Sequence, residues 1–190
     1  DGTRISILGD MGTVEADGTD HVRRGRAPYG SAILDAEEKD GHFRIRAEVD
    51  HGTWRHHREI VYRPNHWLLV TDTVTDLAGQ DHEFRAWWNL PAQLQPIQVG
   101  GDGVFRVDLP DSDDRLWIVE RSGATPIAPV SGERDPLRGW RSRYDTQFEP
   151  AWSLGFLASG TRMHTFRTLF YFGPSQPATD VQYPFTDLER

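Results

Sequence analysis

The chain has 190 residues, with 21 Lys and Arg against 29 Asp and Glu, and a formal net charge of −8. It contains no Cys, which excludes disulfide scaffolds, cysteine-ligated zinc or iron–sulfur sites and a thiol nucleophile. The acidic balance argues against a nucleic-acid partner, and no apolar run reaches the roughly 20 residues that span a membrane. We therefore expect one domain with neither a nucleic-acid partner nor a membrane partner.

Apolar and polar residues alternate with a period of two along much of the chain, as they do in half-buried strands. The pattern is clearest at 43–49, and further strands are expected at 54–62, 67–75, 82–90, 104–109, 116–120, 151–158 and 167–172. Turn-forming segments separate them, and no convincing amphipathic helix or internal repeat is found. Strands at a spacing of roughly ten residues predict an all-β fold, an antiparallel β-sandwich that forms a single domain.

Two hairpins fix a proposed register for three of these strands. If residues 63–66 form the first turn, Arg58 lies opposite Asp72 and the flanking pairs are apolar. A second hairpin through residues 77–80 then places Ala86 beside Asp72 and Trp88 beside Val70. Because an unpaired buried ion is costly, we predict a partly buried ion pair between Arg58 and Asp72 that fixes the register of the strands. The alternative is that Arg58 lines a site.

Residues 125–139 contain three Pro and two Gly, so they are expected to form a long loop, a feature that is often functional in compact domains. The stretch that follows combines Arg side chains, which suit carboxylates, with flat aromatic rings, which suit sugar faces. We predict that five residues contact an acidic sugar or a neighbouring domain: Arg138, Trp140, Arg141, Arg143 and Tyr144. The alternative is a loop whose Trp140 packs on the sandwich while its Arg residues pair with acidic loops.

Patterns for catalysis or metal binding are missing from the sequence. No His-x-His pair occurs among the eight His, and the adjacent His56 and His57 would point to opposite faces of a strand. No Gly-x-Ser-x-Gly nucleophile motif occurs either. We predict no catalytic residue, no metal ligand and no cofactor in this chain.

Several motifs follow one another in a characteristic order. They are an Arg-bearing strand at 57–62, a strand ending in Asp at 67–72, His82 at the start of the next strand, and an aromatic strand that closes in Pro at 88–91. A Gly-Trp-x-Ser-x-x-Tyr-like stretch lies at 138–144 and a closing strand includes 168–170. Over roughly residues 40–175 this order resembles the C-terminal domain of heparinase II/III-like polysaccharide lyases.

The resemblance implies a two-part parent enzyme, an α/α toroid followed by an antiparallel β-sandwich, that cleaves uronic-acid-containing polysaccharides by β-elimination. A base removes the proton next to the carboxylate, the carboxylate charge is neutralised, and an acid protonates the leaving oxygen. The family's catalytic residues lie in the toroid and the first sandwich strands, in His-x-His-x-Asp and His-Asn stretches that this sequence lacks. Asp1 and Gly2 resemble the pair that follows the His-Asn stretch. We therefore expect residues 1–190 to be a fragment that is inactive alone.

In this interpretation the domain braces the toroid and walls one side of a cleft for an acidic polysaccharide, such as a glycosaminoglycan or alginate. Its partners are then its own N-terminal toroid and, through the parent enzyme, that polymer. The resemblance leaves room for a divalent metal in the parent, and it indicates a secreted or periplasmic bacterial protein. The alternative function is a stand-alone carbohydrate-binding or adhesion β-sandwich, which exposed Trp side chains would favour.

Overall fold

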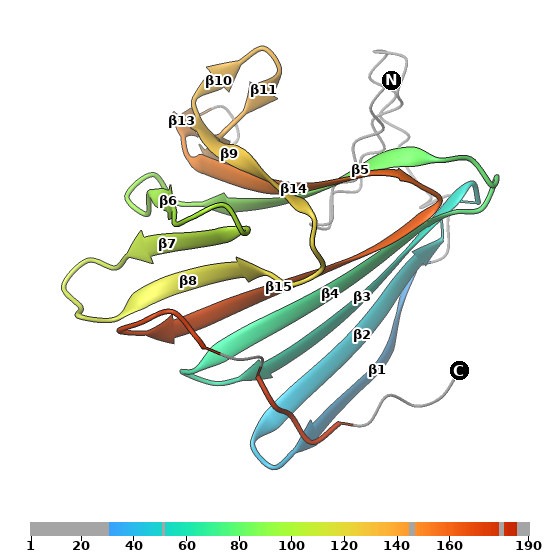
Figure 1. Ribbon diagram of the computed structural model, residues 1–190, viewed down its shortest axis with the longest axis horizontal. Helices are drawn as coiled ribbons and strands as arrows, with labels where there is room; N and C mark the ends of the chain where they lie inside the picture. The colour runs from blue at the N-terminus through green and yellow to red at the C-terminus, as the bar shows by residue number, and fades with distance from the viewer. Residues whose placement is uncertain (1–30, 51, 145–146, 179–180, 186–190) are drawn as a thin grey trace.

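The computed structural model describes residues 31–50, 52–144, 147–178 and 181–185, and the side chains of residues 31, 32, 143 and 144 lie outside this description. Asp1 and Gly2 also lie outside it. Every regular element in the described part is a strand, and all the strand pairs are antiparallel (Figure 1). The strands form two layers around a shared core. The predicted all-β sandwich is therefore confirmed.

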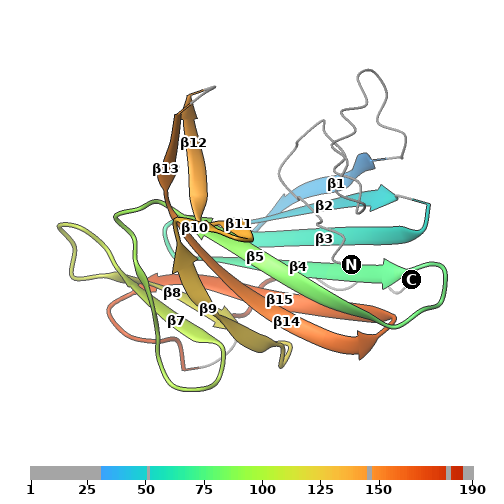
Figure 2. The same cartoon turned by 90° about the horizontal axis from the view of Figure 1, so that it is seen from above.

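The larger layer is an eight-stranded sheet in the order β1-β2-β3-β4-β15-β8-β7-β6, and the smaller is a three-stranded sheet in the order β5-β14-β9. Figure 2 shows β5 and β14 in front of β4 and β15. The strands of the large sheet are β1 (Ser31–Lys39), β2 (His42–Asp50), β3 (Trp54–Arg63), β4 (Trp67–Asp76), β15 (Met163–Gly173), β8 (Arg115–Glu120), β7 (Val104–Asp108) and β6 (Pro96–Gln98). Those of the small sheet are β5 (His82–Leu90), β14 (Trp152–Thr161) and β9 (Thr125–Ser131).

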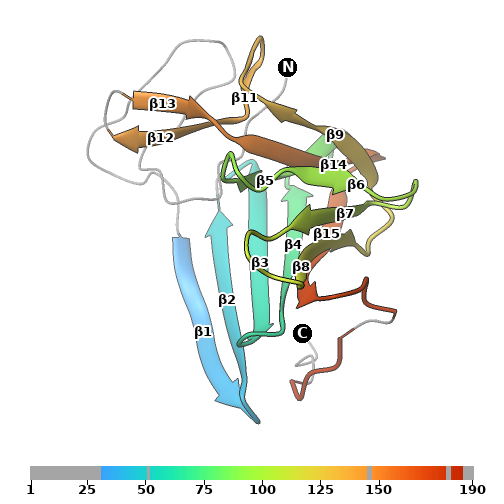
Figure 3. The same ribbon diagram turned by 90° about the vertical axis from the view of Figure 1, so that its left-hand side faces the viewer.

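Four further strands form an arm, defined as residues 133–144 and 147–150. A short hairpin of β10 (Glu133–Arg134) and β11 (Leu137–Arg138) is followed by a two-stranded ribbon of β12 (Trp140–Tyr144) and β13 (Gln147–Pro150). The ribbon projects away from both sheets (Figures 2 and 3). The predicted loop at 125–139 is therefore wrong over most of its length. Its prolines 126 and 129 misled the prediction, because they lie in β9, and an edge strand tolerates Pro.

The large sheet is buried on both faces at its centre. Between the two sheets lies a core in which Phe105 of β7 meets Phe156 of β14 edge to face, with ring centroids 5.8 Å apart. On the outer face, residues 181–185 cover a second apolar cluster that includes Trp67, Trp117 and Leu169. Burial on both faces explains why β8 reads as a nearly continuous apolar run rather than as an alternating strand. Many of the aromatic side chains are therefore divided between two clusters, one on each face of the large sheet.

The register proposed for β3 and β4 is confirmed, whereas the second hairpin is wrong. Arg58 pairs with Asp72 across β3 and β4. The far neighbour of β4 is β15, which places Phe166 beside Asp72, while β5 crosses to the small sheet and pairs with β14. Ala86 and Trp88 thus approach β4 through the core and not along the sheet. The predicted pairing is wrong because alternation defines the apolar face of a strand but not the layer in which the strand lies.

Asp72 is the centre of a buried charge network. Arg58 donates from Nε to Oδ1 at 2.6 Å and from Nη2 to Oδ2 at 2.7 Å, and His56 Nε2 lies 2.7 Å from Oδ1. The Asp72 side chain is 3% exposed and that of Arg58 is 18% exposed. Burial by itself raises the pKa of Asp72, but the hydrogen bonds from His56 and Arg58, together with the Arg58 charge, outweigh it and hold the pKa below its ordinary value. The Arg58 guanidinium also lies 5.4 Å from the Trp88 ring centroid, so the network reaches the small sheet.

We predict that Asp72→Asn lowers the free energy of unfolding by about 3 kcal/mol, because it leaves Arg58 beside a neutral group in a largely desolvated position. Urea unfolding measures this loss. Asp108→Asn is the matched control, since Asp108 pairs with Arg115 on the surface and its side chain is 57% exposed. Such exposed pairs contribute about 0–1 kcal/mol. Equal losses in the two variants would contradict a special role for Asp72.

The same variant has a defined pH dependence. Because the folded-state pKa of Asp72 lies below the unfolded value, its contribution is complete above the unfolded pKa and is lost as pH falls through the folded pKa. The stability difference between wild type and Asp72→Asn is therefore largest near neutral pH and shrinks in strong acid. Urea unfolding at a series of pH values tests this, and a difference that stays constant into strong acid would refute it.

Candidate functional site

The arm joins the sandwich at Gly139. The backbone of this residue has φ = 71°, and a Cβ there would lie 2.7 Å from backbone atoms of β9. Its carbonyl oxygen accepts hydrogen bonds from the N–H groups of Gly132 and Ala151, both at 2.8 Å. Only glycine suits such a left-handed position pressed against neighbouring backbone. Gly139 therefore fixes the directions in which Arg138 and Trp140 leave the sandwich.

Arg138 lies over the indole of Trp87. The guanidinium carbon is 3.6 Å from the ring centroid, within the range of a cation–π contact. On the neighbouring strand, Gly155 is the pairing partner of Trp87, and a Cβ at Gly155 would come within 2.7 Å of the indole. The missing side chain at Gly155 leaves space for the indole, which in turn supports Arg138. Arg138, Trp87 and Gly155 thus form a stacked unit, called the stack below.

Trp140 and Arg141, the next two predicted contact residues, have partners within the arm. The indole N–H of Trp140 donates to the carbonyl oxygen of Glu133 at 2.7 Å. Arg141 forms an ion pair with Glu149, its neighbour across the β12–β13 ribbon. Its positive charge is thus largely balanced within the ribbon.

The remaining two predicted residues, Arg143 and Tyr144, complete the backbone of β12, and their side chains lie outside the described part of the chain. The structure therefore gathers Arg138, Trp140 and Arg141 around Gly139, but it gives each a different neighbour.

Beside Trp140 lies a hollow of about 410 Å³ that the sequence did not predict. It is lined by Arg134, Leu137, Trp140 and Phe148. Leu137 is 61% exposed and Phe148 is 66% exposed, so apolar surface is open to solvent here. The sequence carries a signal for it, because residues 140 and 148 both carry aromatic rings and lie only eight positions apart. The sequence analysis predicts a loop at 125–139 and no strand at 147–150, so it does not bring these two rings together.

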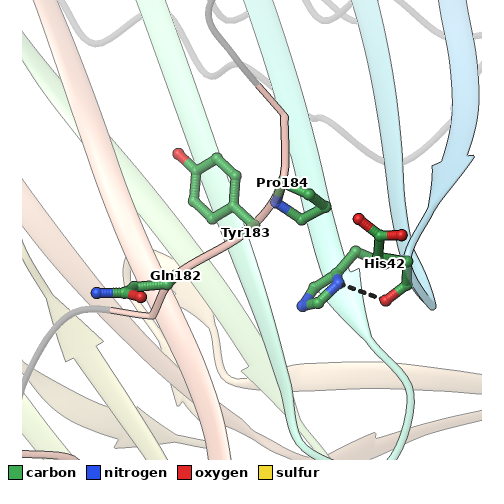
Figure 4. A pocket seen from close by; sticks show the side chains of 5 residues that line it. His42, Gln182, Tyr183 and Pro184 are labelled. Carbon is green, nitrogen blue, oxygen red and sulfur yellow. Dashed lines mark hydrogen bonds between the residues drawn. The ribbon is translucent and has the colours of Figure 1, made fainter.

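A second hollow, of about 330 Å³, lies where residues 182–184 pass the turn between β1 and β2 (Figure 4). His42, Gln182, Tyr183 and Pro184 line it together with Asp40. The His42 Nδ1 atom lies 3.0 Å from the carbonyl oxygen of Asp40, so a backbone group of the turn orients the imidazole. This hollow has a mixed lining and forms where the last described segment packs on the large sheet.

A polar cluster of Glu120, Ser122 and His164 lies at the end of β8 beside β15. Burial raises the pKa of Glu120, although its carboxylate accepts the Ser122 N–H at 2.6 Å and the Thr168 hydroxyl at 3.3 Å. Burial lowers the pKa of His164, whose Nε2 lies 3.1 Å from the Ser122 hydroxyl. In a catalytic triad the carboxylate orients the imidazole, whereas Glu120 bonds to the serine. We therefore interpret the cluster as a structural network.

Among the residues that the structure describes, no three His, Asp or Glu side chains gather closely enough to hold a metal ion. Within that same part of the chain, no helix is long and apolar enough to cross a membrane.

We predict that Gly155→Ala lowers the free energy of unfolding by about 2 kcal/mol, because the new methyl group pushes into the Trp87 ring and overpacks the stack. Urea unfolding measures the change. Gly101→Ala is the control, since a Cβ at Gly101 would meet nothing within 4 Å. We expect that variant to change stability by less than about 1 kcal/mol. If both substitutions lower the free energy of unfolding equally, the close packing of Trp87 on Gly155 is not the reason that position 155 requires glycine.

Comparison with known proteins identifies the fold through structure alone. No family model and no curated protein matches the sequence. The heparan sulfate lyase HepC from Pedobacter heparinus matches with a TM-score of 0.63 at 12% identity, over 78% of this chain and 22% of that one. The heparinase III described as the BT4657 gene product matches with a TM-score of 0.59 at 12% identity, over 75% and 21%. A further heparinase III structure matches with a TM-score of 0.60 at 10% identity, over 77% and 22%.

The chain thus spans about a fifth of the length of each of these enzymes. At this low identity the likeness concerns the fold. The resemblance drawn from the motifs is confirmed at that level: the chain has the fold of one part of heparinase III-type lyases.

Proposed function

We propose that this chain is the C-terminal β-sandwich of a polysaccharide lyase that cleaves uronic-acid-containing polymers by β-elimination. The observation that carries the proposal is the structural match to heparan sulfate lyase HepC over 78% of the chain. The order of the strand motifs supports it independently. Because the chain spans 22% of HepC, the activity belongs to a longer protein of which this is one part.

The role proposed for this part is to brace an α/α toroid and to wall one side of the substrate cleft. Exposed apolar side chains on β1 support contact with another domain, since Ile33 is 72% exposed and Leu34 is 53% exposed. The stack and the neighbouring arm residues supply the cationic and aromatic groups that an acidic sugar requires. The proton transfers of the elimination are assigned to residues of the toroid and the first sandwich strands. Such a polymer substrate also favours a secreted or periplasmic location.

The direct test is an elimination assay on the full-length protein that carries this chain. We expect the ultraviolet absorbance of an unsaturated uronate to rise when the protein is mixed with a glycosaminoglycan or with alginate. A polymer whose carboxyl groups have been reduced to alcohols is the control, because β-elimination requires the carboxylate to acidify the neighbouring proton. Absence of the unsaturated product with every acidic polymer tested would overturn the proposal.

We predict that Arg138→Ala in the full-length protein raises KM about five-fold and changes kcat less, because a charge contact to the bound polymer acts alike on ground state and transition state. Steady-state kinetics on the polymer found active above measures both constants. Arg63→Ala is the control, since Arg63 is exposed at the end of β3, and the turn between β3 and β4 lies away from β10 and β11 in Figure 1. An unchanged KM for Arg138→Ala would remove Arg138 from the contact surface.

A further inference from the structure

We propose that the hollow lined by Arg134, Leu137, Trp140 and Phe148 binds one uronate unit of an acidic oligosaccharide, with Arg134 as the partner of its carboxylate. The inference deepens the proposed function, because it rests on an acidic polysaccharide being the ligand. It adds to the contact predicted for Arg138 a second anion contact at Arg134, which is not among the five contact residues predicted from the sequence.

The geometry of the ribbon places the apolar side chains together. In the antiparallel pairing of β12 and β13, Trp140 lies opposite Pro150 and Ser142 lies opposite Phe148. Paired residues share a face and successive residues alternate, so these four side chains lie on one face of the ribbon. Arg141 and Glu149, the pair between them, lie on the other face. The hollow therefore faces away from the ion pair of the ribbon.

The lining suits the flat face of a sugar ring. Ligand sites are concave, about 300–1,000 Å³ in volume, and lined mostly by apolar and aromatic groups with a few polar ones. This hollow has a volume of about 410 Å³ and is lined by two aromatic rings, one leucine and one arginine. The hydrogen bond from the Trp140 indole to the Glu133 carbonyl oxygen holds one ring in place before a ligand arrives, which lowers the entropic cost of binding.

The charge at the hollow also suits a carboxylate. Arg134 is exposed, and among the described residues no carboxylate pairs with it. Arg141 and Arg138 of the arm differ, because Arg141 pairs with Glu149 and Arg138 lies on Trp87. A guanidinium beside exposed apolar surface matches a uronate, which presents C–H groups on its ring face and a carboxylate at its edge. A neutral apolar partner, such as a side chain of another protein, would leave Arg134 without a counter-charge.

The test is calorimetric titration of the full chain, residues 1–190, with a uronate-containing tetrasaccharide and with the same tetrasaccharide after reduction of its carboxyl groups. We expect wild type to bind the acidic form more tightly. Arg134→Gln should weaken binding of the acidic form about ten-fold and leave the reduced form unchanged, because only the carboxylate contact is lost. Phe148→Ala should weaken binding of both forms several-fold, since it removes the ring against which the sugar packs.

Arg63→Gln is the matched control, because it removes an exposed arginine at the β3–β4 turn, and we expect it to bind as wild type does. Each variant is first compared with wild type in thermal unfolding. Phe148→Leu replaces Phe148→Ala if the latter unfolds early, since it keeps apolar volume but lacks the ring.

The inference is overturned if wild type binds neither tetrasaccharide, or if either Arg134→Gln or the Phe148 variant binds both tetrasaccharides as wild type does. Binding of the reduced form with the same affinity as the acidic form would also overturn it, because a uronate-specific site must distinguish the two. If the elimination assay fails but Arg134→Gln weakens binding of the acidic tetrasaccharide as expected, only the lyase proposal is refuted. Elimination activity with no effect of the hollow variants on binding would refute this inference alone.

Discussion

The buried carboxylate of Asp72 adds a directional side-chain contact to the backbone pairing of β3 and β4. It takes two hydrogen bonds from Arg58 and one from His56, both on β3, while its own strand packs against β15. A shift of β3 by one residue would turn Arg58 to the opposite face and leave Asp72 without its counter-charge inside the core. Since Arg58 also lies near Trp88 of the small sheet, the pair constrains both the register within one layer and the approach of the other.

The arm projects from the sandwich and holds the cationic and aromatic side chains of the candidate site. Gly139 is held by two backbone hydrogen bonds and tolerates no side chain, so the residues on either side of it leave in fixed directions. One of them, Arg138, lies over Trp87 on the small sheet, and the other, Trp140, lines the hollow on the arm. Arginine and tryptophan therefore lie together both in the buried network and on the arm, but the arginines have different roles in the two places. Arg58 neutralises an internal charge, whereas Arg134 on the arm is exposed beside the hollow, where we propose that it meets an external carboxylate.

The strands and one register were predictable because alternation reports local burial. The pairs Tyr62–Leu68, Ile60–Val70 and Arg58–Asp72 follow from a short turn, which leaves few ways to bring β3 and β4 together. The pairing of β5 was not predictable in this way. Its apolar face, with Phe84 and Ala86, is equally consistent with a place beside β4 and with a place across the core from it. The segment at 125–139 was misjudged for a related reason, since Pro excludes a central strand but not an edge strand such as β9.

The sequence by itself determined that the fold is all-β, that Arg58 and Asp72 face each other, and that a cationic aromatic stretch lies at 138–144. These properties depend on residues that are neighbours in sequence or in one hairpin. Only the tertiary structure decided which of those charges remain available. It pairs Arg141 with Glu149, lays Arg138 on Trp87 above Gly155, and brings Arg134 and Phe148 to the same hollow. Such outcomes depend on contacts between distant segments, which a local pattern of apolar and polar residues does not encode.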